Sequence, residues 1–411
     1  MSSGLTTRLA TARHTNTKTA TNRLAIVVSH PIQYYAPWFR CLAGRPELEL
    51  LVFHLWDGGV NLRHDPGFGH VIRWDQPLLE GYPSCFVANT AADPGSHHFS
   101  GLRNPDLVKR LLAWCPDAIL LFGYAYQSHL RLLLDPRLWR CPILLRGDSH
   151  DLVGRHDFRS GLSRLARRLL FQRFAAALAV GQANSAYLLA SGFSARKILQ
   201  APHAVDNHRF QVAAASVQDA ASLWRHQLAI DPNAPVILFA GKFETKKRPL
   251  DLLEAFIQLN DPSAVLVFVG SGALEDLLRE RSAALPKGRV VFAGFQNQSA
   301  MPTAYALADL VVLPSYGSGE TWGLCINEAM NLARPVIVSS HVGCGPDLVI
   351  PGRTGWIFEA GNTVALRDCL AQALSDRQRL RRMGQEALCH IENFSYEQAT
   401  RGLLQALEQL T

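Results

Sequence analysis

Two glutamates, Glu320 and Glu328, are the residues whose type and spacing most strongly indicate chemistry. Seven residues separate them within SYGSGETWGLCINEAMNLARPVIVSS, residues 315–340, which runs from a predicted strand end through a glycine-rich loop into a predicted helix. The glycines allow backbone amides to approach a ligand, and a helix that begins near Gly323 would direct its positive amino terminus at a phosphate. Two carboxylates beside that loop can accept paired hydrogen bonds from vicinal hydroxyls, such as those of a hexose or a ribose. Either glutamate alone would be an ordinary helix-surface charge, but the pair in this loop favours a binding site.

Two lysines, Lys242 and Lys247, lie in the segment GKFETKK directly after a predicted strand. When a sugar leaves a nucleoside diphosphate, negative charge grows on the phosphate oxygens, and fixed cations at that point lower the barrier. The alternative is a solvated turn in a basic stretch. The position of the lysines immediately after a strand favours the functional interpretation.

The segment around the two glutamates resembles the EX7E motif of the retaining family 4 glycosyltransferases, which have the GT-B fold and use nucleotide-sugar donors. The resemblance implies that Glu320 holds hydroxyls of the donor sugar and that Glu328 holds the ribose. It also places Lys242 and Lys247 at the diphosphate, although the family commonly has arginine where Lys242 stands. The backbone amides expected to contact the sugar and the diphosphate are those of Thr321, Trp322, Gly323 and Leu324.

Further matches follow in the family's order and extend the resemblance over residues 235–411. VGSGALED at 269–276 and AGF at 293–295 add Gly272 and Phe295 to the residues expected to bind the donor. No Asp-X-Asp triplet occurs, and that triplet supplies the metal-binding carboxylates of the other main glycosyltransferase fold. We therefore expect a site without a metal and with no cofactor, the nucleotide sugar being a substrate. The absence of the third glycine of GxGxxG disfavours a nicotinamide dehydrogenase.

The segment SHPIQYYAPWFR, residues 29–40, begins where the first predicted strand ends. Together with residues 65–82 and 144–151, it is similar to a subset of bacterial polysaccharide glycosyltransferases. The alternative is a helix-capping turn with aromatic residues in the core, which we prefer for Tyr35 and Trp38. The residues that the resemblance places in the cleft, on the acceptor side, are His30, Gln33 and Tyr34.

The sequence RGDSH follows another predicted strand, at the point where the family usually has a cleft histidine near the donor sugar. Asp148 is the positional equivalent of that histidine, and His150 comes two residues later. Both are therefore candidate catalytic residues together with Glu320. For each, an ordinary hydrogen-bonded loop residue is the alternative.

The elements that must position these residues are short apolar runs alternating with helical periodicity, as in βα units whose sheets are covered on both faces. Open parallel sheets bind ligands beyond the carboxyl ends of their strands. The sequence therefore predicts an α/β protein of the GT-B class, with two doubly wound Rossmann-like domains facing a central cleft. The predicted strands are 24–29, 48–55, 118–123, 142–147 and 176–181 in the first domain, and 235–241, 264–270, 290–294, 310–315 and 335–340 in the second.

Length and composition agree with two domains. The 411 residues exceed the size of an ordinary single domain, and a chain that is 48% hydrophobic and 18% charged is not disordered. No apolar run is long enough to span a membrane. The eight scattered cysteines form no metal-binding or redox pair, which indicates a reducing compartment and a cytoplasmic location.

Domain boundaries follow from shifts in composition and periodicity. A stretch of weak periodicity, residues 201–221, separates the two predicted domains. The expected organisation is a disordered tail at 1–22, an acceptor-side domain at 23–205, a donor domain at 206–393 and a C-terminal helix at 394–411 that packs back on the first domain.

The net charge of +7 is concentrated in the first half, where residues 1–205 hold 23 basic and 13 acidic side chains. The arginine-rich segment 159–178 suits an amphipathic helix on an anionic membrane surface, so we expect peripheral attachment to the inner face of the plasma membrane. The alternative is a helix that packs on the sheet with solvated arginines. Nucleic acid is not an expected partner, because no stacking platform or finger motif accompanies the basic half.

The function implied by the resemblance is retaining transfer of a hexose-type sugar from a nucleotide sugar to a saccharide or lipid-linked saccharide acceptor. The expected pathway is the synthesis of a surface polysaccharide, such as a capsule or an exopolysaccharide. One alternative is another chemistry of the GT-B fold, such as nucleotide-sugar epimerisation. The other is a catalytically inert protein that binds a glycan or a nucleotide sugar.

Overall fold

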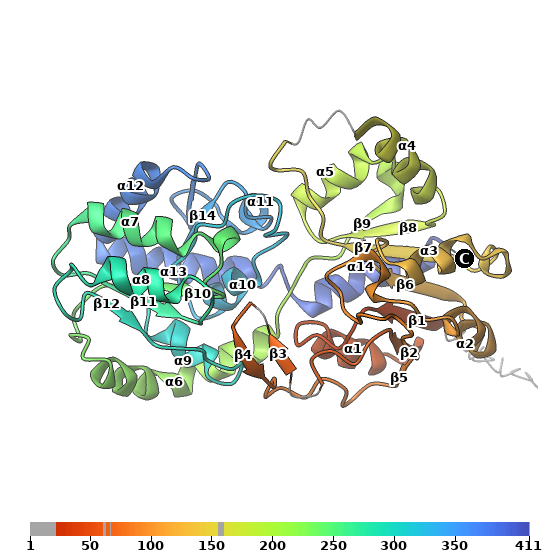
Figure 1. Ribbon diagram of the computed structural model, residues 1–411, viewed down its shortest axis with the longest axis horizontal. Helices are drawn as coiled ribbons and strands as arrows, with labels where there is room; N and C mark the ends of the chain where they lie inside the picture. The colour runs from red at the N-terminus through yellow and green to blue at the C-terminus, as the bar shows by residue number, and fades with distance from the viewer. Residues whose placement is uncertain (1–21, 61–62, 66, 155–159, 411) are drawn as a thin grey trace, which may run out of the picture.

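The computed structural model describes residues 22–60, 63–65, 67–154 and 160–410, which form two α/β domains side by side (Figure 1). The tail predicted at 1–22 lies outside the described residues except for Asn22, which begins the first strand. Among the described helices, none is long and apolar enough to cross a membrane.

The first domain contains a parallel sheet of seven strands in the order β5-β2-β1-β6-β7-β8-β9. Its central strands read as unbroken apolar runs because helices cover both faces; β6, for example, is buried at every residue. The five strands predicted here are confirmed, whereas β5 and β9 were missed because each has three partly exposed residues. The strands are β1 Asn22–Val28, β2 Leu48–His54, β5 Ser84–Phe86, β6 Ala118–Phe122, β7 Ile143–Gly147, β8 Ala176–Ala179 and β9 Ile198–Gln200.

The second domain contains a parallel sheet of six strands in the order β12-β11-β10-β13-β14-β15. Its five predicted strands are confirmed, and β15, which holds the edge next to β14, was not predicted. The two parallel sheets confirm the predicted doubly wound architecture. The strands are β10 Val236–Ala240, β11 Val265–Val269, β12 Val290–Phe292, β13 Leu310–Leu313, β14 Val336–Ser339 and β15 Gly355–Phe358.

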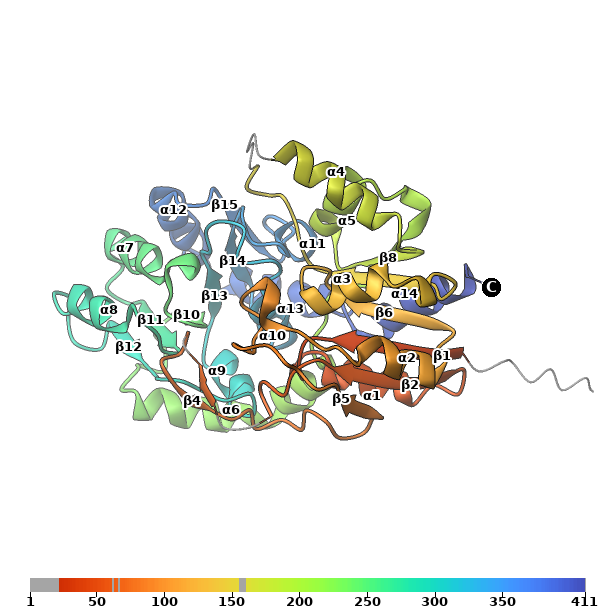
Figure 2. The ribbon, with the colours of Figure 1, turned by 45° about the vertical axis from the view of Figure 1, so that its right-hand side comes forward.

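Helices pack on both faces of each sheet (Figure 2). Those of the first domain are α1 Ala36–Ala43, α2 Leu107–Trp114, α3 Gln127–Leu134, α4 Ser160–Phe171 and α5 Gln182–Ala190. Those that follow are α6 Asn207–Gln227, α7 Pro249–Leu259, α8 Glu275–Ser282, α9 Met301–Ala306, α10 Leu324–Asn331, α11 Gly345–Leu348, α12 Thr363–Leu374, α13 Arg377–Ile391 and α14 Tyr396–Glu408.

Weak periodicity was noted through residue 221 and no helix was predicted there, but the structure has α6, a helix of 21 residues. Its side chains that pack on the core recur at helical spacing. Three of the five residues in that stripe are alanine or valine, so the hydrophobic contrast with the outer face is small and the sequence signal is weak. The residues of the stripe are Phe210, Ala214, Val217, Ala221 and Trp224.

The last helix, α14, leaves the second domain and packs on the first (Figure 1). Leu403 and Ala406 join the apolar core under α1, and the Trp38 indole donates a hydrogen bond to Thr400 Oγ1 at 3.0 Å. The backbone of Gly402 lies so close to β9 that a Cβ would stand 2.0 Å from the Gln200 carbonyl oxygen. The chain therefore crosses between the domains twice, once before α6 and once before α14.

A small antiparallel hairpin, β3 Arg63–Asp65 with β4 His70–Ile72, projects from the first domain toward the second. It lies between the two domains in both views (Figures 1 and 2). The backbone carbonyl of Phe68 accepts a hydrogen bond from Ser271 Oγ of the second domain at 3.0 Å. This contact brings first-domain residues to one side of the cleft.

Candidate active site in the cleft

A cavity of about 440 Å³ lies between the domains, at the carboxyl ends of both parallel sheets. Its walls come from loops that follow β1 and β7 of the first domain and β10, β11 and β13 of the second. This is the edge at which doubly wound sheets bind their ligands. Of the residues predicted from the sequence, those that line the cavity are Gln33, Tyr34, Asp148, Lys242, Lys247, Phe295, Glu320, Thr321, Trp322, Gly323, Leu324 and Glu328.

Glu320 and Lys247 form a buried ion pair at the centre of the second-domain wall. Glu320 is 8% exposed and its Oε2 also accepts a hydrogen bond from Ser315 Oγ at 2.9 Å. Burial alone would lower the pKa of Lys247, but the adjacent carboxylate outweighs that effect and raises the pKa above its ordinary value. Lys247 therefore stays charged at neutral pH, and it presents a fixed cation to the cavity.

Glu328 lies deeper, on α10, and is 2% exposed. Its Oε2 accepts a hydrogen bond from the Tyr305 hydroxyl at 2.7 Å, while its Oε1 is buried without a hydrogen-bond partner in the described part of the chain. Burial raises the pKa of Glu328. A buried acceptor without a donor costs free energy, so a ligand hydroxyl that reaches Oε1 would gain a hydrogen bond at a site that is already desolvated.

The loop between the two glutamates ends in Gly323, where the backbone has φ +100°, and α10 begins at the next residue. A Cβ at Gly323 would also stand 2.8 Å from a methyl group of Leu313, so the turn requires glycine. Leu324 and Cys325, the first residues of α10, line the cavity, so the amino terminus of this helix lies where it can bind an anion. The Trp322 indole instead packs inward and donates to Asn327 Oδ1 at 2.8 Å.

Lys242 reaches across the cleft and pairs with Asp65 of the first domain, at 2.8 Å from Nζ to Oδ1. Burial would raise the pKa of Asp65, but the hydrogen bond and charge of Lys242 lower it. The Lys242 ammonium also stands 4.8 Å from the centre of the Phe68 ring. This lysine therefore ties the two domains together at the cavity wall.

Gly272 and Phe295 lie beside that contact. Gly272 does not line the cavity, but a Cβ there would stand 3.0 Å from the Gly67 carbonyl oxygen, so it allows the close approach of the first domain. The Phe295 ring packs edge-on against Phe68 at 4.9 Å and against His70 at 5.1 Å. These aromatic side chains form an apolar end of the cavity near the lysines.

Asp148 directly follows β7, and it places a first-domain carboxylate at the cavity. Its Oδ2 accepts a hydrogen bond from Thr321 Oγ1 at 2.6 Å and lies 3.6 Å from Nε2 of His203. Burial would raise the pKa of Asp148, but hydrogen bonds from His203 and Thr321 lower it to about 2. Asp148 is therefore ionised at neutral pH and holds the loop after Glu320 from the opposite domain.

His30 and His150 are absent from the described residues that line the cavity. His150 Nε2 lies 3.1 Å from the Glu320 carbonyl oxygen, and its Nδ1 accepts a hydrogen bond from the Leu152 amide at 3.2 Å. Both ring nitrogens are thereby engaged in holding the loops together. His30 pairs with Ser29 and packs against Trp56, and burial lowers its pKa to about 4. His30 is therefore neutral at physiological pH.

One cluster of side chains has the composition of a metal site. Within the described residues, one group of at least three metal-ligating side chains converges, formed by Asp93, His97 and His98. It lies in a loop of the first domain, and none of the three lines the cavity.

Asp65, His203 and Tyr305 are cleft residues that the sequence analysis did not single out. Asp65 is the first residue of the segment 65–82 that the sequence analysis compared with polysaccharide glycosyltransferases. Its ion pair with Lys242 could not be predicted from that segment. His203 sits in the linker between the domains, and Tyr305 reads as one more core residue of a helix. Their roles depend on contacts between distant segments, which no local pattern reveals.

Comparisons with known proteins agree with this geometry. Residues 221–388 match the family described as "Glycosyl transferases group 1". A D-inositol 3-phosphate glycosyltransferase of Nocardia farcinica is 29% identical over 371 residues, which cover 80% of this chain and 77% of the relative.

Solved structures with a similar fold include a protein bound to UDP and glucose and a galactosyltransferase. HepE of Anabaena, solved with UDP and glucose, has a TM-score of 0.70 at 20% identity over 94% of this chain and all of its own. The lipopolysaccharide outer core galactosyltransferase WaaB has a TM-score of 0.65 at 15% identity over 95% of this chain and all of its own.

Proposed function

We propose that this chain, a GT-B-fold protein whose second domain belongs to the group 1 glycosyltransferases, transfers a hexose-type sugar from a nucleotide sugar with retention of configuration. The observation that carries the proposal is the single cavity shared by the Glu320–Lys247 pair, the unpartnered Oε1 of Glu328 and the amino terminus of α10. Those groups suit, in turn, sugar hydroxyls, a ribose and a diphosphate. A UDP-sugar donor is supported by the relative solved with UDP and glucose.

In this mechanism the second domain holds the donor. The charge of the departing diphosphate falls on Lys247, on Lys242 and on the amides at the start of α10, where fixed positive groups stabilise the transition state. Glu320 accepts hydrogen bonds from the donor sugar and keeps Lys247 in place. The ionised Asp148 faces the same loop from the first domain and can stabilise positive charge that develops on the sugar. An acceptor hydroxyl attacks from the face that the diphosphate leaves.

The acceptor we propose is a saccharide or a lipid-linked saccharide of a surface polysaccharide pathway. Gln33 and Tyr34 line the first-domain side of the cavity, where an acceptor can approach the donor sugar. The similarity to a lipopolysaccharide galactosyltransferase supports an acceptor of this class. Turnover of a panel of nucleotide sugars, measured as released nucleoside diphosphate with and without oligosaccharide acceptors, tests the proposal. Acceptor-dependent release supports transfer, whereas interconversion of the donor without release indicates epimerisation and binding without turnover indicates an inert protein.

We expect the chemical step to need no divalent metal. Lys242 and Lys247 already supply two fixed cations at the cavity, and they take the role that a metal has at other diphosphate-leaving sites. Activity measured in excess EDTA should stay within about twofold of the untreated enzyme, a change of less than 0.5 kcal/mol in the barrier. A strict requirement for magnesium or manganese that added metal restores would contradict this prediction.

We also propose that α4 attaches the first domain to anionic membrane. Leu165 and Leu169, one helical turn apart, are 55% and 58% exposed, while Phe171 on the same helix packs in the core. Arg168 is exposed between the two leucines. Of the arginines in the segment predicted from the sequence, Arg155 and Arg159 lie outside the described residues. The exposed leucines beside basic residues suit shallow insertion among anionic head groups and a cytoplasmic, peripheral location.

Vesicle sedimentation tests this attachment. Replacing Arg164 and Arg168 with glutamine should weaken binding to phosphatidylglycerol vesicles, since each basic residue near such a surface contributes about 1 kcal/mol. Arg167 is left in place, because its guanidinium lies 5.4 Å from the centre of the Tyr187 ring and its Nε is buried. Leu165→Ser with Leu169→Ser should weaken vesicle binding as well, and added salt should do the same. Leu223→Ser on α6, where the leucine is 59% exposed, is the matched control and should bind as the native protein does. If native protein stays in the supernatant, or if the α4 variants sediment unchanged, α4 is an ordinary solvated helix.

A further inference from the structure

A second hollow lies at the edge of the second sheet opposite the cleft, where the strands begin. Asp309 stands directly before β13 and Pro335 directly before β14, and α13 runs along one side. The hollow has a volume of about 480 Å³. An adjoining hollow of about 350 Å³ shares several of its residues and adds Arg225 and His226.

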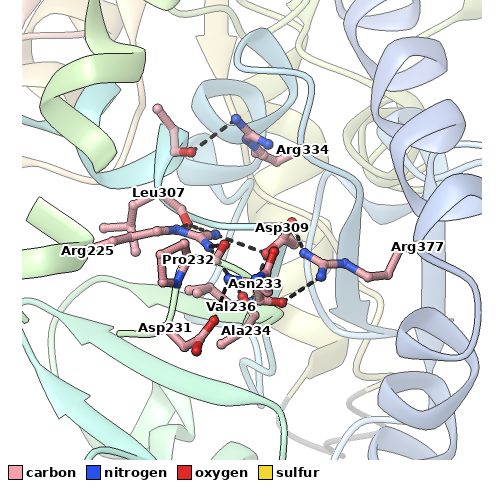
Figure 3. Close-up of polar contacts among 11 residues, drawn as sticks. Arg225, Asp231, Pro232, Asn233, Ala234, Val236, Leu307, Asp309, Arg334 and Arg377 are labelled. Carbon is pink, nitrogen blue, oxygen red and sulfur yellow. Dashed lines mark hydrogen bonds and ion pairs between the residues drawn. The ribbon is translucent and has the colours of Figure 1, made fainter. Parts of the chain in front are cut away.

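The two hollows hold five arginines and one acidic side chain. Those that line them are Arg225, Arg334, Arg377, Arg381, Arg382 and Asp309. Figure 3 shows Arg225 and Arg377 at Asp309, whereas Arg334 lies apart from that carboxylate and contacts a different residue. Positive charge gathered in a concave surface raises the local concentration of anions.

Asp309 does not neutralise this cluster, because its carboxylate is already shared. Its Oδ2 accepts hydrogen bonds from Arg225 at 3.1 Å and from the Val236 amide at 2.9 Å, and its Oδ1 lies 3.7 Å from Arg377. The Arg225 guanidinium is also bound by the Leu307 carbonyl oxygen at 2.9 Å (Figure 3). These two residues form the structural floor of the hollow.

The other arginines have donors to spare. Arg334 donates to the Ala306 carbonyl oxygen at 3.2 Å, but its buried Nε has no partner within the described chain. Burial, together with the nearby charge of Arg225, lowers the pKa of Arg334, which means that its charge is only partly compensated. Arg381 and Arg382 are exposed on α13, and neither lies within ion-pair distance of a carboxylate in the described residues. The charge of Arg382 acts on Asp376, whose side chain caps α13.

We propose that this hollow is a second anion-binding site, for a phosphate group, distinct from the donor site. A planar guanidinium binds a phosphate through two parallel hydrogen bonds, and Arg334, Arg381 and Arg382 surround one concave surface with such donors. The site stands at the amino ends of the strands, whereas the donor cavity stands at their carboxyl ends. It does not depend on the function proposed for the cleft.

The phosphate can belong to a soluble phosphorylated molecule or to a lipid head group, and both present the same chemistry. Calorimetric titration with inorganic phosphate at low ionic strength tests the shared chemistry. The double variant Arg381→Gln with Arg382→Gln should bind phosphate about tenfold more weakly or worse, because hydrogen bonds to charged groups are lost. Arg379→Gln removes one positive charge from the same helix at a position that lines neither hollow, and it should bind phosphate as the native protein does.

Sedimentation with phosphatidylcholine vesicles that contain phosphatidic acid separates the two sources. Weaker sedimentation of the double variant, against Arg379→Gln, identifies a head group, and unchanged sedimentation with weaker phosphate binding identifies a soluble ligand. Donor turnover without phosphate should be the same in the double variant as in the native protein. Equal phosphate binding by the native protein and the double variant, or an equal loss in Arg379→Gln, would overturn the proposal.

Discussion

Replacing Glu320 with glutamine should lower the rate of sugar transfer by about 100-fold or more, the effect of removing one preorganised group from a transition-state site. The carboxylate accepts from Ser315 and pairs with Lys247, so glutamine keeps the shape but loses the charge that pairs with the lysine. Sugar hydroxyls would also lose a charged acceptor. Transfer rate and thermal unfolding should be measured on the same preparation.

Glu386→Gln is the matched control for that experiment. Glu386 pairs with Arg353 on the surface, and its side chain is 46% exposed. Its replacement should change neither the transfer rate nor the melting temperature beyond error, since exposed pairs contribute little. Near-normal turnover by Glu320→Gln, with an intact fold, would remove Glu320 from the mechanism.

Replacing Lys247 with glutamine should lower the rate of sugar transfer about as much as Glu320→Gln does. It should also lower the unfolding free energy. Both members of the pair are largely buried, with side chains 16% and 10% exposed. Removing one partner leaves the other charge uncompensated, which costs about 3 to 5 kcal/mol of unfolding free energy for a fully buried pair. The variant also lacks the Lys247 cation that would stabilise the departing diphosphate. Denaturant unfolding and steady-state transfer measure the two losses separately.

The double variant Lys247→Gln with Glu320→Gln separates the structural role of the pair from its catalytic role. With no charge left unpaired, unfolding free energy should return toward the native value, whereas transfer should stay as low as in either single variant. A double variant as unstable as Lys247→Gln would mean that the pair is not the source of the stability loss. Recovery of transfer in the double variant would contradict a catalytic role for both residues.

The sequence alone predicted the strands well where both faces of the sheet are covered. A strand such as β10, VILFA, is apolar at every position and followed by glycine, a pattern that has few other interpretations. The short strand β5 has no buried residue in its three positions and gave no such signal. Helix α6 was missed for the opposite reason, because its buried stripe is rich in alanine and valine. Hydrophobic periodicity reveals a helix only when its buried face is clearly more apolar than its exposed face, and in α6 the two faces differ little.

The residues that line the second-domain side of the cleft could be predicted because they occupy one continuous motif after β13 and another after β10. The first-domain side could not, because it depends on how distant segments meet. Lys242 was expected at the diphosphate, and it pairs with Asp65, 177 positions away in sequence. His150 was expected in the cleft. It does not line the cavity, and its Nε2 lies 3.1 Å from the Glu320 carbonyl oxygen. Such contacts are set by domain packing and leave no local trace in the sequence.

The central claim is that the cleft binds a nucleoside diphosphate through Glu328, Lys247 and the start of α10. Calorimetric titration of UDP against the native protein and Glu328→Gln tests this claim most directly. The native protein should bind one UDP per chain, and Glu328→Gln should bind it about tenfold more weakly, because the amide has one acceptor oxygen where the carboxylate has two and carries no charge. Arg381→Gln with Arg382→Gln, far from the cleft, should bind UDP as the native protein does. Equal UDP affinity in the native protein and Glu328→Gln, with both folded, would contradict the account.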